Sequence, residues 1–474
     1  MTALKRYLGL APSIGTLLAL LWVVDAKAQT VADPQPQAST QGEPAATPPN
    51  APVTPETWNW FYQATSIGDY HGAFYAPYTG AFSLQPNAEH DVSLTTTVFL
   101  GFRPFANTQI YFDPEIAGGR GFSGVNGVAN APNGELPRVS SAAPKPYIAR
   151  LYVTQDFGFG TERESFESGE NQLAGSRPMT RYSVTIGRFT VTDFFDDNAF
   201  SHDPRTQFMG WGVMYNGAWD YPADTRGYTW GWVHEFHTRL WSVRYGSAAE
   251  PRVANGLRFD RRILRDRGDM FEGERRWGSK DRAGAVRLLS YFNHTDSGSY
   301  AEAIALSRQT GQPPDVTATR QIGRLKYGGG ISADQQVAND IGVFGRLGWN
   351  DGKTESFAFT AIDRLATIGI SVKGARWKRP DDIAASEVTV SGLSAVHAQY
   401  LALGGYDFLI GDGALRYGTE NIWETYYNAK LFRGFFAGYD LQYIVNPAYN
   451  QDRGPVWVHS LRLHLEFGKP DFVK

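Results

Sequence analysis

The segment from residue 457 to residue 467 alternates apolar and polar side chains, one residue after another. With the two-residue period of a β-strand, one face is mostly apolar and the other mostly polar. The first face holds Trp457, His459, Leu461, Leu463, Leu465 and Phe467, and the second holds Val458, Ser460, Arg462, His464 and Glu466. A surface strand of a soluble sheet also alternates in this way, so the decision depends on whether the pattern repeats along the chain at membrane-spanning length.

Two segments of the same kind precede this one, at residues 423–431 and 435–445. They are separated by a three-residue turn that ends in Gly434, a pattern typical of a hairpin closed by a glycine bulge. The next connection, residues 446–455, is longer and rich in Asn, Pro, Asp and Gly. A short turn at one end and a long loop at the other is typical of a membrane β-barrel.

Continued along the chain, the pattern predicts an all-β fold, a transmembrane antiparallel β-barrel of about sixteen strands, with fourteen or eighteen as alternatives. Strands running up from the periplasm are expected to begin near Trp58, Thr108, Arg181, Leu240, Gly284, Asp340, Ile383 and Phe435. Strands running down are expected to begin near His90, Lys145, Gly227, Asp269, Gln321, Arg364, Asn421 and Pro455. Short connections fall on the periplasmic side, except that residues 157–180 are expected to form a long one.

Charged residues keep to one face of these strands. Arg244 alternates with Trp241, Val243 and Tyr245 and lies on the polar face of its segment. An arginine in contact with lipid at mid-depth costs about 2 to 4 kcal/mol. The polar face must therefore line the interior of the barrel.

The beginning of the chain predicts export. A positive start, an apolar run at residues 8–24 and small residues at Ala26 and Ala28 predict a cleaved signal peptide over residues 1–28, with a retained anchor helix as the alternative. Residues 29–56 contain seven prolines among polar and small residues, which predicts a periplasmic linker without a core of its own.

Residues 57–474 show no second low-complexity break and are expected to form one barrel domain. The composition, with no Cys, 13 Trp, 24 Tyr, 29 Phe and 51 Gly, suits a barrel divided between lipid and a wet interior. The chain has 45 basic and 48 acidic residues, and removal of the signal peptide takes three basic and one acidic residue, leaving 42 and 47. The resulting charge of about −5 argues against nucleic acid as a partner.

A long outward connection is predicted between the fifth and sixth strands, at residues 192–226. It is rich in acidic, basic and aromatic residues: Asp193, Asp196, Asp197, His202, Asp203, Arg205, Trp211, Trp219, Asp220, Tyr221, Asp224 and Arg226. Carboxylates and arginines bond sugar hydroxyls, and aromatic faces stack on the apolar faces of sugar rings. The alternatives are a plain solvated loop, or a Ca²⁺ site on Asp193, Asp196 and Asp197.

A second charged segment lies between the seventh and eighth strands. It contains Arg258, Arg261, Arg262, Arg265 and Arg267. A solvated loop is the simpler interpretation, and contact with lipopolysaccharide phosphates is the alternative.

Four segments resemble a known family. They are RFTVTDFFDDNAFSHDPRTQF (188–208), NGAWDYPADTRGYTWG (216–231), RLGWNDGKTE (346–355) and NPAYNQDRGPV (446–456). They are similar to segments of the carbohydrate-selective outer-membrane porins, and the resemblance extends over about residues 58–467. It implies a barrel in the bacterial outer membrane that admits sugars by diffusion, narrowed by the long loop. The chain departs from the family in continuing beyond Phe467, which affects recognition by the barrel-insertion machinery, and residues 468–474 are expected to hang free in the periplasm.

The prediction is therefore a porin for passive diffusion of small sugars, without enzymatic activity, cofactor or metal. Its expected partners are small carbohydrates, outer-membrane lipid with lipopolysaccharide, the barrel-insertion machinery and, as a homotrimer, further copies of the chain. The residues expected to line the pore are Asp196, Asp197, His202, Asp203, Arg205, Trp219, Asp220, Tyr221 and Arg226 in the loop, and Arg150, Arg244, Arg346, Asp440 and Arg462 on the strands.

Two other functions stay open at this point. A secreted β-rich glycosidase would use two of the loop aspartates as acid and nucleophile or base. An anion, phosphate or general diffusion porin is favoured by the inward arginines and opposed by the aspartate-rich loop.

Overall fold

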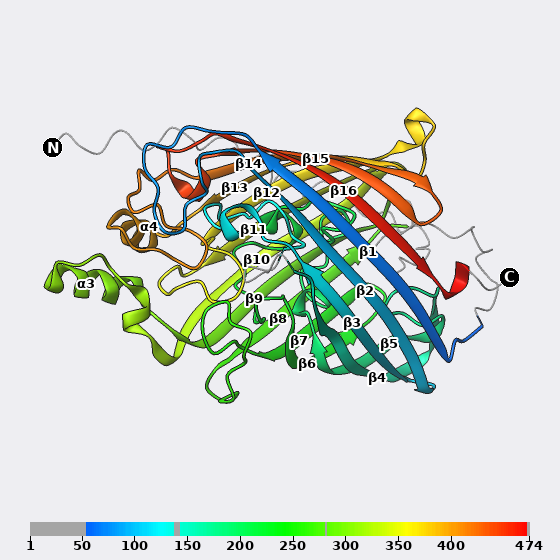
Figure 1. The fold of residues 1–474 in the computed structure, drawn as a ribbon. Helices are drawn as coiled ribbons and strands as arrows, with labels where there is room; N and C mark the ends of the chain where they lie inside the picture. Colours follow the sequence, from blue (N-terminus) through cyan, green and yellow to red (C-terminus); the bar gives the residue numbers. More distant parts are fainter. Residues whose placement is uncertain (1–53, 137–142, 280–281, 472–474) are drawn as a thin grey trace, which may run out of the picture. The chain divides into compact units, whose positions relative to one another are not determined.

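The computed structural model describes residues 54–136, 143–279 and 282–471 of the chain. Within these ranges sixteen antiparallel strands form one closed barrel (Figure 1), which confirms the predicted fold. Each strand pairs with its neighbours along the chain, and the last strand closes the barrel against the first. The strands are β1 (Trp58–His71), β2 (Glu89–Phe105), β3 (Thr108–Gly118), β4 (Lys145–Phe166), β5 (Gly175–Phe189), β6 (Thr229–His237), β7 (Trp241–Ala249), β8 (Arg267–Trp277), β9 (Gly284–Ser297), β10 (Gln321–Ala338), β11 (Ile341–Asn350), β12 (Arg364–Lys373), β13 (Ile383–Gly392), β14 (Glu420–Phe432), β15 (Phe435–Val445) and β16 (Val456–Gly468).

The alternation that predicted the strands divides their side chains between two surfaces. On β16, Trp457, Leu461 and Leu463 are 45%, 57% and 42% exposed on the outside, whereas Arg462 is 1% exposed on the inside. The charged face therefore points into the barrel, as predicted from the cost of placing arginine in lipid.

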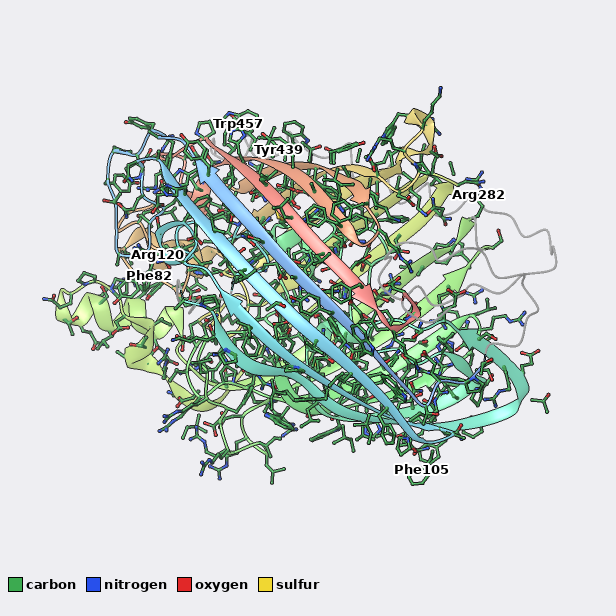
Figure 2. All side chains as sticks on the ribbon, turned by 45° about the vertical axis from the view of Figure 1, so that its right-hand side comes forward. Phe82, Phe105, Arg120, Arg282, Tyr439 and Trp457 are labelled. Atoms are coloured by element: carbon green, nitrogen blue, oxygen red, sulfur yellow. The ribbon has the colours of Figure 1, made fainter. Side chains whose placement is uncertain are left out.

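Exposed aromatic side chains form a band near each end of the barrel. One band holds Tyr70, Trp230, Phe292, Trp349, Trp423, Tyr439 and Trp457, and the other holds Trp58, Phe102, Phe105, Phe157, Phe159, Phe236, Trp241 and Phe432. Figure 2 shows Tyr439 and Trp457 on the outer surface and Phe105 at the opposite end of the barrel. Exposed Val, Leu and Ile lie between the bands, which is the pattern of a membrane-embedded barrel.

The connections differ in length at the two ends of the barrel. Among the described residues, 106–107, 167–174, 238–240, 278–279 with 282–283, 339–340, 374–382 and 433–434 lie at the short-turn end. At the long-loop end lie residues 72–88, 119–136 with 143–144, 190–228, 250–266, 298–320, 351–363, 393–419 and 446–455. The helices α3 (Tyr300–Thr310) and α4 (Ala395–Ala402) both lie at the long-loop end (Figure 1). The predicted turn at Gly434 is present, with glycine in the left-handed region at φ 70° and a bulge beside it.

Among the described residues, no helix has the length and apolarity needed to cross a membrane. The predicted signal peptide at residues 1–28 lies outside the described part of the chain, as does the predicted linker up to residue 53. Glu56, at the end of that linker, packs on the short-turn end, where its backbone N–H donates to the carbonyl oxygen of Ala174 at 3.0 Å.

The expectation of a long connection at residues 157–180 is wrong. Strand β4 continues to Phe166 and β5 begins at Gly175, so the connection is residues 167–174. The pairing register shifts between Phe159 and Arg163, and this irregularity hides the strand from a search for strict alternation.

The expectation of a free tail after Phe467 is wrong as far as residue 471. Strand β16 runs to Gly468, and the Asp471 carboxylate accepts the Gly468 N–H at 2.8 Å and pairs with Arg433 at 2.6 Å. Lys469 lies 4.5 Å from the ring centroid of Trp58 and 3.5 Å from the Glu56 carboxylate. The tail thus fastens the last strand to the first, and residues 472–474 lie outside the described part.

Several of the long connections share one apolar cluster, and three of them are central to the site. Residues 119–136 and 351–363 pack against residues 190–228, which we call the inner loop. Their apolar core includes Trp211 and Trp219 of the inner loop with Ala131 and Phe359 of the other two. The inner loop contains two short helical turns, η2 (Val191–Asp193) and α2 (Trp211–Met214). A solute crossing the barrel must pass beside this packed plug.

Candidate functional site

The inner loop is tied to one side of the barrel by buried arginines. Arg346 on β11 donates to both oxygens of Asp196, at 3.1 and 3.0 Å, and to the carbonyl oxygens of Val213 and Ser201 at 2.7 and 2.6 Å. Arg462 on β16 donates to two further carbonyl oxygens of the loop, those of Pro204 and Gln207, at 2.8 and 2.7 Å. Because the guanidinium group has five donors in a planar fork, it can satisfy several loop carbonyls at once.

Carboxylates on the same side hold backbone N–H groups. The Glu424 side chain accepts the N–H groups of Met209 and Gly210 at 2.5 and 3.1 Å. The ring of Phe208, the residue before Met209, packs on the same wall. Its centroid lies 5.5 Å from that of Phe344 on β11 and 4.9 Å from that of Tyr426 on β14. Strands β11 to β16 therefore form a loop-anchoring wall.

Asp220 joins the inner loop to residues 351–363. Its carboxylate accepts the N–H groups of Phe357, Ala358 and Phe359 at 2.8, 2.7 and 3.1 Å. The Lys326 ammonium lies 3.0 Å from the same carboxylate and balances its charge. An aspartate so used supports the loop from behind and does not face a solute.

On the other side of the inner loop lies a cavity of about 570 Å³. Its strand residues come mainly from β2 to β9, which we call the cavity-lining wall, and no described residue of β11 to β16 lines it. Its loop residues include Asp193, Phe194, Asp197, His202, Asp203, Arg205, Tyr215, Tyr221 and Arg226. The open volume inside the barrel therefore lies between the inner loop and this wall.

Arginines and carboxylates neutralise each other along this cavity. The Arg150 guanidinium binds the two Asp193 oxygens at 2.7 and 2.6 Å. Arg205 contacts Glu115 and Glu135, each at 3.0 Å. A third cluster centres on Arg244, which pairs with Glu272 at 2.8 Å, with Glu274 at 2.7 Å and with Glu235. Each cluster presents both donors and acceptors to a solute.

Two aromatic rings stand beside these charges, half-buried at the cavity surface. The Arg226 guanidinium lies 4.2 Å from the ring centroid of Tyr147 on β4. The Tyr215 ring meets His202 edge to face at 5.2 Å. Rings of this kind offer an apolar face beside polar groups, which is how a sugar is contacted.

A bulge in β4 brings Tyr147 and Arg150 to the same side of the strand. Asp113 of β3 pairs with Arg150 and the next residue, Pro114, pairs with Ile148, so Ala149 is an extra residue. Strict alternation would place residues 147 and 150 on opposite faces. The sequence pattern therefore predicted that Arg150 points inward but missed Tyr147, and both line the cavity.

The charges of the loops respond to burial and to their partners. Burial alone would lower the pKa of Arg205, but the Glu135 and Glu115 carboxylates outweigh it and hold that pKa well above its usual range. Burial raises the pKa of Glu135, and the Arg205 charge only partly offsets this. Burial also raises the pKa of Glu170, in the turn of residues 167–174, to about 8, against the opposing effect of its Gln63 hydrogen bond. Glu170 is thus a neutral acid at the cavity below that pH.

Eight of the fourteen predicted pore residues line the cavity: Arg150, Asp197, His202, Asp203, Arg205, Tyr221, Arg226 and Arg244. The other six do not line it and are buried: Asp196, Trp219, Asp220, Arg346 and Arg462 in contacts of the inner loop, and Asp440 on β15 beside Gln442. Trp219, expected as a stacking surface, is 0% exposed and packs 6.2 Å from Phe195.

Several lining residues were not predicted, among them Tyr147, Asp193, Glu115 and Glu135. Glu115 had a usable signal, because it follows Asp113 at the two-residue spacing of inward charges on β3. Glu135 had none, since it belongs to a loop whose path into the barrel is set by tertiary contacts. Of the alternative Ca²⁺ ligands, Asp193 and Asp196 are engaged by Arg150 and Arg346, and no metal-binding group of three side chains occurs among the described residues.

The family model "Carbohydrate-selective porin, OprB family" matches residues 106–467. The chain belongs to this family. The match begins at residue 106, later than the residue 58 expected from the resemblance. A search of curated proteins gives no match.

One solved structure gives the same fold for this porin, and two others are similar at a lower score. The high-pH structure of Pseudomonas putida OprB is 16% identical, with a TM-score of 0.64 over 86% of this chain and 94% of that chain. The low-pH structure of the same protein is 12% identical, with a TM-score of 0.45 over 86% and 92% of the two chains. The outer-membrane channel DcaP of Acinetobacter baumannii is 8% identical, with a TM-score of 0.48 over 89% and 100%.

This porin is therefore a carbohydrate-selective channel of the bacterial outer membrane, and its family and fold are those of a channel. Its apolar outer surface and aromatic bands contact the lipid. In such barrels the short turns face the periplasm and the long loops face outward, so the inner loop enters from the extracellular side.

Proposed function

We propose that small neutral sugars cross this porin by passive diffusion between the inner loop and the cavity-lining wall. The observation that supports this path most strongly is the pairing of the cavity arginines. Arg150, Arg205 and Arg244 are each bound by carboxylates, so the lining offers many hydrogen-bonding groups without a large excess of either charge. A polar, nearly balanced surface favours a hydroxyl-rich neutral solute over an ion.

Selection in this proposal involves no chemical reaction. The inner loop limits solute size, the charged clusters orient hydroxyl groups, and Tyr147 and Tyr215 contact the apolar faces of the ring. Binding must stay weak, because a solute that is held tightly cannot leave. The lining residues in this proposal include Asp197, His202, Asp203, Tyr221 and Arg226 of the inner loop.

The glycosidase alternative needs two carboxyl groups free to act on a sugar. Asp196 is neutralised by Arg346 and Asp220 by Lys326, both in buried pairs. The anion-channel alternative needs unpaired cations along the path, and Arg226 is the lining arginine that meets an aromatic ring in place of a carboxylate. The balance of lining charges favours the neutral-sugar porin.

Liposome swelling tests this proposal. Vesicles containing the porin should swell with monosaccharides faster than with anions of matched size. Swelling that is faster with the anions would favour an anion-selective channel, and no swelling with any small sugar would contradict sugar diffusion through this path.

The role of the charged clusters is tested by Arg150→Gln. This change leaves Asp193 at the cavity, and Asp113 buried behind it, without their cation, so the reversal potential in a salt gradient should shift toward cation selectivity. Arg275→Gln is the matched control, because Arg275 lies on the outer surface over Trp241 at 4.8 Å. An equal shift in both variants would remove Arg150 from the permeation path.

The remaining partners stay predictions. The homotrimer is checked by chemical cross-linking of detergent-solubilised porin, where three linked copies are expected. Outer-membrane lipid, including lipopolysaccharide, is expected around the exposed apolar band. Recognition of the last strand by the insertion machinery is checked by Phe467→Ala, which should reduce the amount of porin in the outer membrane.

A further inference from the structure

A hollow of about 430 Å³ lies on the outer surface of the barrel, apart from the lumen. It is lined by Leu264, Arg265, Arg267, His294, Ile322 and Gly323, and we call it the outer hollow. These residues come from the loop of residues 250–266 and from the ends of β8, β9 and β10 at the long-loop end. Side chains that carry or can gain positive charge thus share this hollow with aliphatic ones.

Strand register places the outer hollow above the lipid-facing aromatic band. Arg267 of β8 pairs across with His294 of β9, which in turn pairs with Leu325 of β10. Two residues further into the membrane, on the same faces, Phe292 pairs with Tyr327. Phe292 is 40% exposed and Leu325 is 42% exposed. The hollow therefore lies where the membrane core gives way to the headgroups of the outer leaflet.

The loop of residues 250–266, which we call the arginine loop, has a defined conformation. Arg262 is held by Asp260 and by Asp266 at 3.1 Å, and the Asp266 carboxylate also accepts the N–H of Gly323 at 3.0 Å. The backbone N–H groups of Arg265 and Asp266 both donate to the carbonyl oxygen of Arg262. One arginine thus closes the turn and fixes the positions from which its neighbours project.

Four arginines of the arginine loop, three of them in the part of the loop next to β8, are left for an outside partner. Arg252, Arg258, Arg261 and Arg265 are exposed, and their guanidinium groups make no ion pair with any described residue. The nearby carboxylates are already engaged by other groups. Asp269 binds Arg267 at 3.0 Å and Tyr245 at 3.1 Å, and Asp296 lies 4.0 Å from Arg262.

We propose that the arginine loop and the outer hollow bind the phosphate groups of a phosphorylated glycolipid of the outer leaflet. Guanidinium groups match phosphate oxygens in paired hydrogen bonds. Leu264 and Ile322, 87% and 51% exposed, line the same hollow as Arg265 and Arg267 and would meet the acyl chains of the same molecule. Free phosphate offers the same anion but no apolar part, so these exposed aliphatic side chains favour the lipid. The proposal deepens the lipid contact given under Proposed function.

The test compares two forms of lipid A, the phosphorylated glycolipid anchor, with the detergent-solubilised porin. Binding of lipid A with both phosphates and of dephosphorylated lipid A is measured by microscale thermophoresis. Wild-type porin should bind the phosphorylated form more tightly. The triple variant R258Q/R261Q/R265Q should lose about 100-fold of that affinity, since each arginine near an anionic lipid surface contributes roughly fivefold.

The matched control removes three exposed arginines at the short-turn end, as R376Q/R379Q/R433Q, and should bind lipid A as wild type does. Sugar-dependent swelling of liposomes should be unchanged in both triple variants, which separates this site from permeation and shows that the barrels are folded. Equal binding of lipid A by wild type and the arginine-loop variant would overturn the proposal. If millimolar inorganic phosphate displaced labelled lipid A as strongly as unlabelled lipid A does, the ligand of this site would be free phosphate and not the lipid.

Discussion

The two walls of the lumen carry similar inward residues and use them differently. On the loop-anchoring wall, Arg346 and Arg462 are each 1% exposed and donate to the backbone and carboxylate oxygens of the inner loop. On the cavity-lining wall, the side chains of Arg150 and Arg244 are 14% and 11% exposed and pair with carboxylates beside an open volume. We expect the first wall to position the constriction, and the second, which also holds the inner loop through the Arg150–Asp193 pair, to meet the solute.

The difference shows what separates a structural from a permeation role in such a barrel. Both walls follow the same two-residue alternation, which states only that a side chain points inward. Whether it then faces water or protein depends on the side to which the inner loop is fastened. A buried arginine is retained where several acceptors surround it, because removing one partner leaves the others unsatisfied.

The largest effect is expected from breaking the anchor at Arg346. Arg346→Met leaves the buried Asp196 carboxylate without its cation and removes one donor from each of two loop carbonyls, a loss of about 3 to 5 kcal/mol for a buried pair. The inner loop should detach from the wall. Single-channel recording should show a larger and noisier conductance and a loss of discrimination between mono- and disaccharides.

The double variant R346M/D196N serves as the control, since it removes the carboxylate that the single change leaves uncompensated. It should recover part of the wild-type conductance and size discrimination. A single variant with unchanged conductance would mean that Arg346 does not hold the constriction.

Much of the fold could be predicted because lipid imposes a regular pattern. Sixteen strands were expected, and most begin within two residues of the expected position. The exception is β5, which begins at Gly175 and not near Arg181, because irregular pairing opposite Arg163 breaks the alternation. Regular strands follow from local rules, whereas bulges depend on how neighbouring strands fit together.

The site could be predicted only in part, for a related reason. The inner loop was recognised by its position and its charged residues, but its sequence does not state which side faces the cavity. Asp196 and Asp197 are adjacent, yet the first is buried against Arg346 and the second lines the cavity. The positive φ of 56° at Asp196 is part of this local geometry and has no alternating signal.

A smaller effect is expected on the cavity-lining wall, from Tyr147→Ala. The change removes the ring that lies under the Arg226 guanidinium at the cavity surface. Loss of a stacking surface worth about 0.5 to 1.5 kcal/mol should raise the sugar concentration for half-maximal current block by roughly two- to tenfold.

Tyr439→Ala is the control for this prediction, because Tyr439 is 48% exposed on the outer surface of the barrel (Figure 2). It should leave the sugar-dependent block unchanged. Equal block of the current in wild type and Tyr147→Ala would show that sugars do not contact this ring. Only the charged clusters of the cavity-lining wall would then remain as contacts for a sugar.

The smallest effect concerns charge at the short-turn end of the cavity. The carboxyl group of Glu170 lines the cavity, and burial raises its pKa from 4.5 to about 8. Between these values the folded porin keeps a proton that the unfolded chain has lost, so this group lowers stability as pH rises through that window. Above pH 8 the group ionises and adds one negative charge to the path.

Reversal potentials measured from pH 6.5 to pH 9.5 should therefore move toward cation selectivity near pH 8. The size of this shift should not exceed the effect of one added negative charge in the path. Glu170→Gln should abolish this movement, because glutamine stays neutral throughout. Glu167→Gln, three residues earlier in the same turn, changes an exposed carboxylate and should keep it. If the movement persists in Glu170→Gln, another acid of the cavity-lining wall titrates there, and burial by the inner loop does not set the charge of this path.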